Sequence, residues 1–242
     1  MQIKIIAPEK KKIVIMNRYL QQVLFFSFVF LFVSCHHNNS DQDHPEGVIH
    51  FEIKYTKNKT NVPSVFLPKL MVMKFNKRYA KTSIDAFGFG LAYIHDLRKN
   101  INITLLQVLE HKFYYIGEKD EYPCGFGELA GMQVTFLPDT LTIEGLPCLK
   151  ARISFPDNRH EPFDVWYTKS FKVKNPNRTL PYKAIDGVLM QFNVLFDKIE
   201  MQFRAKNVKY QKIPSDEFVI PEGYQLISRE KMDGYIRELL EK

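Results

Sequence analysis

From residue 49 onward, the dominant period of apolar residues is two, not the 3.6 of a helix. In the segment 49–55, every second residue is apolar and the residues between are His, Glu and Lys. A period of two is typical of a strand with one buried face. The same alternation recurs in four further segments, which therefore predict strands: 149–155, 163–168, 190–196 and 199–205.

Shorter apolar runs predict eight more strands, at 70–75, 78–84, 91–96, 101–107, 111–116, 132–136, 140–144 and 208–213. Two pairs of neighbouring strands are expected to form hairpins: 149–155 with 163–168, and 190–196 with 199–205. Many sequential strands joined by short turns predict one antiparallel meander, and a sheet of that size must twist and curl. The expected fold is mainly β, a single curled antiparallel sheet.

One segment has the period of a helix instead, and it lies at the C-terminus, at 229–241. Ser228 precedes it as an N-cap, and apolar residues then recur at helical spacing: Met232, Tyr235, Ile236, Leu239 and Leu240. Gly234 within the segment costs about 1 kcal/mol relative to Ala. Tertiary contact is therefore expected to hold the helix, with its apolar stripe docked on the concave face of the sheet and forming one side of any cavity there.

The first 35 residues follow a different pattern. Arg18 precedes an apolar run at 23–33, and Ser34-Cys35 follows it. The run is shorter than the roughly 20 residues that span a bilayer. It resembles the signal peptide of a bacterial lipoprotein, which implies a cleaved leader at 1–34 and an acyl group such as palmitate on Cys35. Ordinary secretion and an uncleaved anchor are the alternatives, and Met16 is a second candidate for the true start.

The remaining chain divides into a polar tether and one domain. Residues 35–46 contain no apolar side chain after Cys35 and cannot form a core. Residues 47–242 show no internal repeat or low-complexity stretch, which predicts a single domain. The leader carries five of the basic residues and one acidic residue, so the net charge falls from +7 to +3 without it. That charge is too small for a nucleic-acid partner.

Cys124 and Cys148 are the two cysteines that remain once Cys35 carries lipid. An oxidising periplasm permits a disulfide between them, which would stabilise the fold by about 3 kcal/mol through chain entropy. The alternative is two separate buried thiols. Zinc is disfavoured because neither cysteine has a Cys or His at ligand spacing.

Four motifs in the second half of the chain resemble a family of exported proteins. They are 141–151 (LTIEGLPCLKA), 165–168 (VWYT), 185–190 (IDGVLM) and 218–224 (FVIPEGY). In this order they are similar to the DUF4412-type proteins of Bacteroidetes, over roughly residues 140–228. The resemblance implies the open β half-barrel of the LolA/LolB lipoprotein carriers, which encloses an apolar cavity, and it supplies no catalytic residue. Within the first motif, Gly145 and Pro147 indicate a turn or bulge.

The usual chemistry of enzymes is missing from the sequence. There is no G-x-S-x-G, H-E-x-x-H or P-loop motif. His95 and Asp96 are adjacent, so they point to opposite faces of a strand and cannot pair. The acidic run at 118–121 is expected to be a solvated turn. Trp166 and Tyr167 are the candidate ligand-binding residues, although simple packing is the favoured explanation for Trp166.

These features predict a non-enzymatic lipoprotein of the cell envelope, anchored to a membrane by lipid and facing the periplasm or the cell surface. The abundance of aromatic residues, 20 Phe and 12 Tyr, suits a cavity for a lipid or acyl chain. The rival hypothesis is a protein–protein interaction module at the outer membrane, and an unrecognised hydrolase is the third. No metal or other cofactor is expected. A large apolar cleft would favour the first hypothesis, and a filled sheet with an exposed apolar patch would favour the second.

Overall fold

A computed structural model describes residues 46–129, 131–156, 160–196 and 198–241. The leader 1–34, Cys35 and the tether as far as residue 45 lie outside these residues. The proposals of cleavage and lipidation therefore remain predictions.

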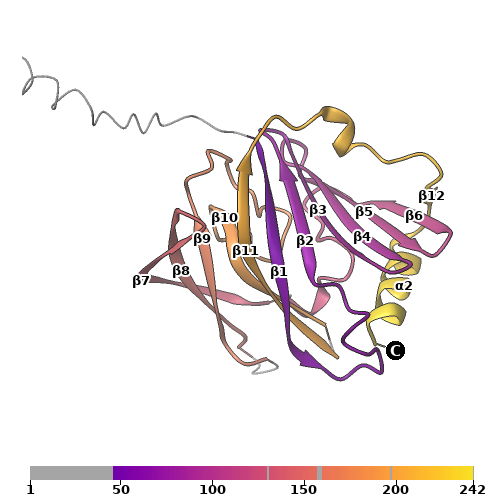
Figure 1. Cartoon of the computed structure of the whole chain (residues 1–242), viewed down its shortest axis with the longest axis horizontal. Coiled ribbons are helices and arrows are strands. Elements are labelled where there is room, and N and C mark those ends of the chain that lie inside the picture. Colours follow the sequence, from indigo (N-terminus) through magenta and orange to yellow (C-terminus); the bar gives the residue numbers. More distant parts are fainter. Residues whose placement is uncertain (1–45, 130, 157–159, 197, 242) are drawn as a thin grey trace, which may run out of the picture. The chain divides into compact units, whose positions relative to one another are not determined.

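Twelve strands form one sheet in the described part of the chain (Figure 1). Across the sheet their order is β12-β6-β5-β4-β3-β2-β1-β11-β10-β9-β8-β7. Neighbours are antiparallel, except β12 and β6, which run parallel over two residues. The strands are β1 (Gly47–Asn58), β2 (Leu70–Phe75), β3 (Tyr79–Ala86), β4 (Phe89–Asp96), β5 (Ile101–Val108), β6 (His111–Ile116), β7 (Gln133–Ile143), β8 (Leu146–Ser154), β9 (Phe163–Thr168), β10 (Val188–Leu195), β11 (Ile199–Tyr210) and β12 (Gln225–Leu226).

The sheet curls without closing, because its edge strands β12 and β7 do not pair with each other. Both predicted hairpins are present, as β8–β9 and β10–β11. The single curled antiparallel sheet predicted from the strand pattern is therefore confirmed, and its open curl is consistent with the half-barrel that the family resemblance implies.

Two of the predicted strand divisions are wrong. The segments 132–136 and 140–144 belong to one strand, β7, which contains a bulge between Leu137 and Thr140. Pro138 lies in this bulge, and it has no N–H to donate to a ladder. The segments 199–205 and 208–213 are likewise one strand as far as Tyr210, because Lys206 is an extra residue in the register opposite His50 and Phe51.

The turn between β7 and β8 explains the glycine of the first family-like motif. Glu144 and Gly145 have φ values of +49° and +76°, and Ile143 pairs with Leu146 on either side of them. Two residues with positive φ between paired strands form the tight hairpin turn of type I′. Gly145 adopts such a φ without steric cost, so the expected turn or bulge is a turn.

The convex face of β2–β5 is covered by the segment 211–224, which we call the strap. It includes a short 3₁₀ helix, η2 (Ser215–Phe218). The ring of Phe218 stacks on Tyr79 with centroids 5.3 Å apart. Lys81 Nζ donates to the carbonyl of Glu217 at 3.0 Å, and Lys74 pairs with the Glu217 carboxylate. The closing motif at 218–224 therefore has a packing role on the outside of the sheet.

The C-terminal helix, α2 (Arg229–Glu241), docks as its apolar stripe predicts. Met232 and Ile236 are 0% and 2% exposed, and Leu239 is half-buried against the same core. The ring of Tyr235 lies 5.2 Å from that of Phe113 in β6. The side chain of Leu240 lies outside the described residues.

An ion-pair network fixes the start of α2 to the loop after β6. Arg229 lies 2.6 Å from a Glu121 carboxylate oxygen and 3.2 Å from Asp233, and it donates to the Tyr122 carbonyl. Burial tends to raise the pKa of Glu121, but hydrogen bonds from Glu118 N–H and Tyr115 and the charge of Arg229 outweigh it and lower this pKa. The acidic run was expected to be a solvated turn. That expectation is wrong for Glu121, whose carboxylate is bonded within this network. The sequence does not reveal the contact, because Arg229 lies far from Glu121 along the chain.

Replacement of Ile236 by Ala should lower the free energy of unfolding by about 2–4 kcal/mol, because it leaves a cavity under the helix. Urea denaturation followed by circular dichroism measures this loss. Arg237→Ala, at the exposed neighbouring position, is the matched control and should change stability by less than about 0.5 kcal/mol. Equal small effects of both substitutions would show that α2 is not docked.

Candidate functional site

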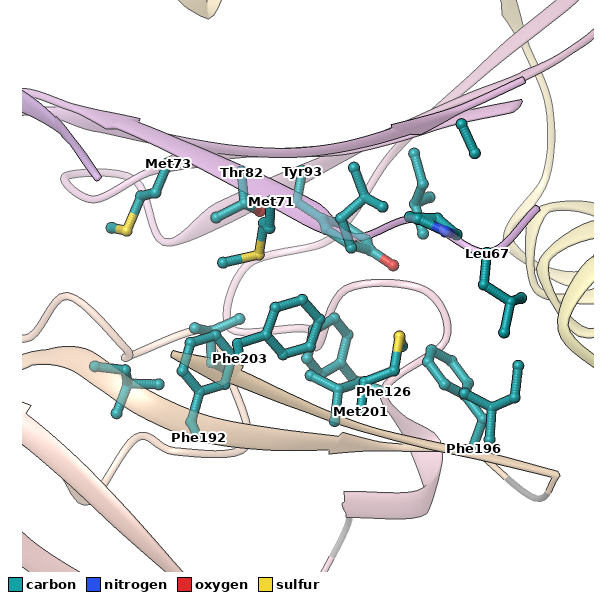
Figure 2. Close-up of a pocket in the computed structure, with 18 of the residues that line it drawn as sticks. Leu67, Met71, Met73, Thr82, Tyr93, Phe126, Phe192, Phe196, Met201 and Phe203 are labelled. Carbon is teal, nitrogen blue, oxygen red and sulfur yellow. The ribbon is translucent and has the colours of Figure 1, made fainter. Parts of the chain in front are cut away.

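A cavity of about 290 Å³ lies inside the curl of the sheet. Its volume is close to the lower end of the roughly 300–1,000 Å³ range of small-molecule pockets. Figure 2 shows that side chains from two parts of the sheet face each other across it. Met71, Met73, Thr82 and Tyr93 project from β2, β3 and β4, and Phe192, Met201 and Phe203 project from β10 and β11.

The alternation of the strands explains which residues line the cavity. In β3, residues 80, 82, 84 and 86 line it, and in β4, residues 89, 91, 93 and 95 do so. Successive residues of a strand point to opposite faces. The intervening residues therefore belong to the convex face, where Ile94 and Ala92 pack beneath the strap. The convex face is more polar in β3, where it carries Lys81, Ser83 and Asp85, than in β4.

The loop at 169–187 closes one end of the cavity. Pro176, Asn177 and Tyr182 line this end and are buried. The Asn177 amide donates to the carbonyls of Ile185 and Gly187, both at 2.8 Å. These bonds fold the loop back on itself and hold its buried side chains in place.

The opposite end of the cavity is open, and we call it the mouth. Phe66 and Phe87 line the cavity here although they are 61% and 95% exposed. Phe87 occupies the turn between β3 and β4, and Phe66 lies in the loop between β1 and β2. Leu239, near the end of α2, completes this rim. Large apolar side chains therefore surround the route between the cavity and solvent.

The tyrosine hydroxyls of the lining are bonded to the protein itself. Tyr55 donates to the carbonyl of Pro68 at 2.7 Å, and Tyr93 donates to that of Cys124 at 2.8 Å. Tyr182 donates to the Asn193 carbonyl. Burial raises the pKa of Tyr55 to about 12 and that of Tyr93 still further. These groups stay neutral, and their hydrogen atoms are directed to backbone carbonyls.

His95 lies at the closed end of the cavity and is 4% exposed. Its Nδ1 is 3.2 Å from the Thr179 hydroxyl, which in turn donates to the side-chain oxygen of Asn102 at 3.0 Å. Burial lowers the pKa of His95 to about 4, although a hydrogen bond with Asn102 opposes this shift. The imidazole is therefore neutral near pH 7. Asp96 points away from His95, as expected for adjacent residues of a strand. Its carboxylate accepts a hydrogen bond from the Arg98 N–H in the turn that follows.

Neither of the ligand-binding residues proposed from the sequence lines the cavity. The Trp166 ring packs beneath Lys150, whose Nζ is 5.5 Å from the ring centroid. Tyr167 is 5% exposed and its ring lies 6.2 Å from that of Phe136. The structure therefore assigns packing roles to both residues. Nothing in the local pattern around Met71, Thr82 or Phe203 marked them as lining residues, because the size of the cavity depends on how far the sheet curls.

Cys124 and Cys148 are both free and buried, which corrects the expected disulfide in favour of two separate thiols. Cys148 in β8 donates to the carbonyl of Leu146 at 3.4 Å. Cys124 lies in the loop after β6, hydrogen-bonded to Thr104 of β5. Burial raises the pKa of Cys124 to about 12, so its thiol stays protonated.

The described residues contain no group of three or more His, Cys, Asp or Glu side chains that could hold a metal ion. Within the same residues, no helix is long and apolar enough to cross a membrane.

Comparison with known proteins gives a likeness of fold alone. No family model matches the chain, and no curated protein matches it. A solved structure of PNGF-II in the C2 space group is similar over 79% of this chain, with a TM-score of 0.50 and 15% identity. The match spans 33% of the PNGF-II chain. A crystal structure of MucB matches with a TM-score of 0.31 and 10% identity, over 76% of this chain and 60% of that one.

Acid should weaken the fold through His95. The unfolded imidazole binds a proton below about pH 6.5 and the buried one only below about pH 4, so stability falls across this interval, by up to about 3 kcal/mol. Urea denaturation at pH 7, 5.5 and 4 measures the loss. His95→Gln should remove this part of the pH dependence, and His111→Gln, at an exposed histidine, should leave it intact. Identical pH profiles for the two variants would contradict the assignment.

Both thiols of the domain should be available to alkylation once the protein is unfolded without reductant. In the native protein at pH 8, Cys124 should react far more slowly than an exposed cysteine, because reaction requires the thiolate and burial disfavours it. Peptide mapping by mass spectrometry gives the labelled fraction of each cysteine. Recovery of a peptide in which Cys124 is joined to Cys148 would overturn the result.

Proposed function

We propose that the protein is a non-enzymatic lipoprotein of the cell envelope that binds an apolar ligand, a lipid or an acyl chain, inside its half-barrel. The observation that carries this proposal is the chemistry of the cavity lining. Almost every side chain of the lining is apolar, and its tyrosine hydroxyls donate to the protein backbone. A polar ligand would lose its hydrogen bonds to water without replacement, whereas an acyl chain has none to lose.

The flexibility of the lining also suits a chain-like ligand. Met71, Met73 and Met201 project into the cavity from both sides (Figure 2). Methionine is unbranched and adapts its shape to irregular gaps. A lining with several methionines therefore accommodates chains of different length or saturation better than a lining of β-branched residues.

The membrane location is supported by the sequence of the leader. The apolar run at 23–33, followed by Ser34-Cys35, has the arrangement of a lipoprotein signal peptide. The similarity of the motifs between 141 and 224 to DUF4412-type exported proteins favours the same compartment. Lipid on Cys35 would join the domain to a membrane through residues 36–46.

A second function, a protein–protein interaction module at the outer membrane, is favoured by one observation. Val65, Phe66, Phe87 and Leu109 are 61% to 95% exposed, on loops and turns at the same end of the sheet. Exposed apolar groups of this kind mark partner sites as well as ligand openings. The first function is preferred because Phe66 and Phe87 also line the cavity, which makes them part of its opening.

Filling the cavity should abolish binding of an acyl ligand. Thr82 lies on β3 with its side chain in the cavity, so Thr82→Trp would occupy the space that the ligand needs. Titration with a fluorescent fatty acid should show at least about tenfold weaker binding, equivalent to roughly 1.4 kcal/mol. Native mass spectrometry of the unmodified protein from its own host should show a co-purifying lipid.

Asp85→Trp is the matched control, because Asp85 lies on the same strand with its side chain exposed on the opposite face. It adds the same bulk without entering the cavity and should leave binding unchanged. Unaltered binding in Thr82→Trp, or no binding by the unmodified chain, would contradict the cavity proposal and favour the interaction module.

A further inference from the structure

Exposed lysines gather where the chain enters the sheet. Gly47, the first residue of β1, pairs with Phe75 at the end of β2 and with Tyr210 at the end of β11. Lys77 follows Phe75 by two residues, and Lys209 and Lys212 flank Tyr210; all three side chains are exposed. Three cations therefore lie on the strand ends that border Gly47.

The loop at 169–187 adds further lysines at the same place. The ring of Phe171 lies 4.9 Å from that of Phe75 and 5.6 Å from that of Tyr210. Phe171 is 3% exposed, so this contact fixes the loop against the two neighbours of Gly47. Lys169 and Lys174, on either side of Phe171, are exposed. We call Lys77, Lys169, Lys174, Lys209 and Lys212 the lysine collar.

Acidic residues do little to offset the collar. The segment 169–185 contains five basic residues and no acidic residue. Glu46, next to Gly47, accepts a hydrogen bond from Ile213 N–H at 2.9 Å. Asp186 accepts from Asn175 N–H, and Glu217 is engaged by Lys74 and Lys81. Backbone hydrogen bonds leave the charges of Glu46 and Asp186 in place, but the five lysines of the collar outnumber these two carboxylates, so the surface keeps a net positive charge.

We propose that the lysine collar docks on the anionic headgroups of a lipid membrane. Charge complementarity favours this partner, because several lysines held on one surface gather anionic headgroups without a shaped pocket. The position of the collar favours it too, because the collar surrounds Gly47, through which residues 1–46 join the domain.

The test compares how the purified full chain partitions onto vesicles of two compositions, neutral phosphatidylcholine alone and phosphatidylcholine with phosphatidylglycerol. The quantity compared is the partition coefficient on the anionic vesicles divided by that on the neutral vesicles. Any contribution of residues 1–45 that does not depend on charge cancels in this ratio. Each lysine near an anionic surface strengthens binding by roughly fivefold. The triple variant Lys169→Glu, Lys174→Glu and Lys209→Glu should therefore lower the ratio by about 100-fold or more. The effect should shrink in 0.5 M salt.

A matched triple variant, Lys54→Glu, Lys59→Glu and Lys69→Glu, makes the same change in net charge at exposed lysines outside the collar. Its ratio should fall far less than that of the collar variant. An equal fall of the ratio in both variants would overturn the proposal. A ratio near one for the unmodified chain would also overturn it, and would point to an acidic protein as the partner of the collar. Fatty-acid binding should be unchanged in the collar variant. Vesicle partitioning therefore tests the collar proposal alone, and fatty-acid titration tests the cavity proposal alone.

Discussion

The antiparallel pairing of β1 with β11 is the interaction on which the rest of the structure depends. On one side of it lies the meander β2–β6, and on the other lies the meander β7–β10. Each meander is built from local hairpins, but the two are joined in the sheet only through residues 47–58 and 199–210. This contact has a high loop-closure cost and is expected to form late in folding. It also contains two register shifts, and bulges of this kind bend and twist a sheet. The strand pair that unites the two halves therefore also contributes to the curl that encloses the cavity.

The sequence predicted the parts of the fold that depend on local pattern. Alternation and shorter apolar runs together located most of the strands, and the spacing of Met232, Ile236 and Leu239 gave the docked face of the helix. The errors occur where a long strand contains an irregular residue. Pro138 and Lys206 interrupt the period of two, but each lies in a bulge of its own strand, and the pairing with the partner strand continues on both sides. The two-residue strand β12 could not be predicted, because its pairing with β6 depends on where the strap leaves the sheet.

The sequence predicted the apolar character of the candidate site, but not which residues line it. Alternation at Met201 and Phe203 indicates that these residues face inward, whereas residues 70–73 are all apolar and their pattern does not distinguish the two faces. Inward-facing residues also fill a core as readily as they line a cavity. The curl of the sheet decides between the two, and it is set by contacts far apart in the sequence. The same limit explains the thiols, because an oxidising compartment permits a bond between Cys124 and Cys148 but does not place their sulfur atoms together. Trp166 stood out in the sequence because it is the single tryptophan, and in the fold it packs beneath a lysine.

The cavity mouth and the start of β1 lie at opposite ends of the sheet. Phe66 and Phe87 follow the ends of β1 and β3, whereas Gly47 begins β1 and lies beside the loop that closes the cavity. A strand of 12 residues is about 40 Å long. A domain held to a bilayer at Gly47 would thus present its opening away from that bilayer, into the surrounding aqueous space. A ligand in the cavity would then be exchanged with a soluble carrier, or with a second membrane facing the first, instead of with the lipids beneath the protein.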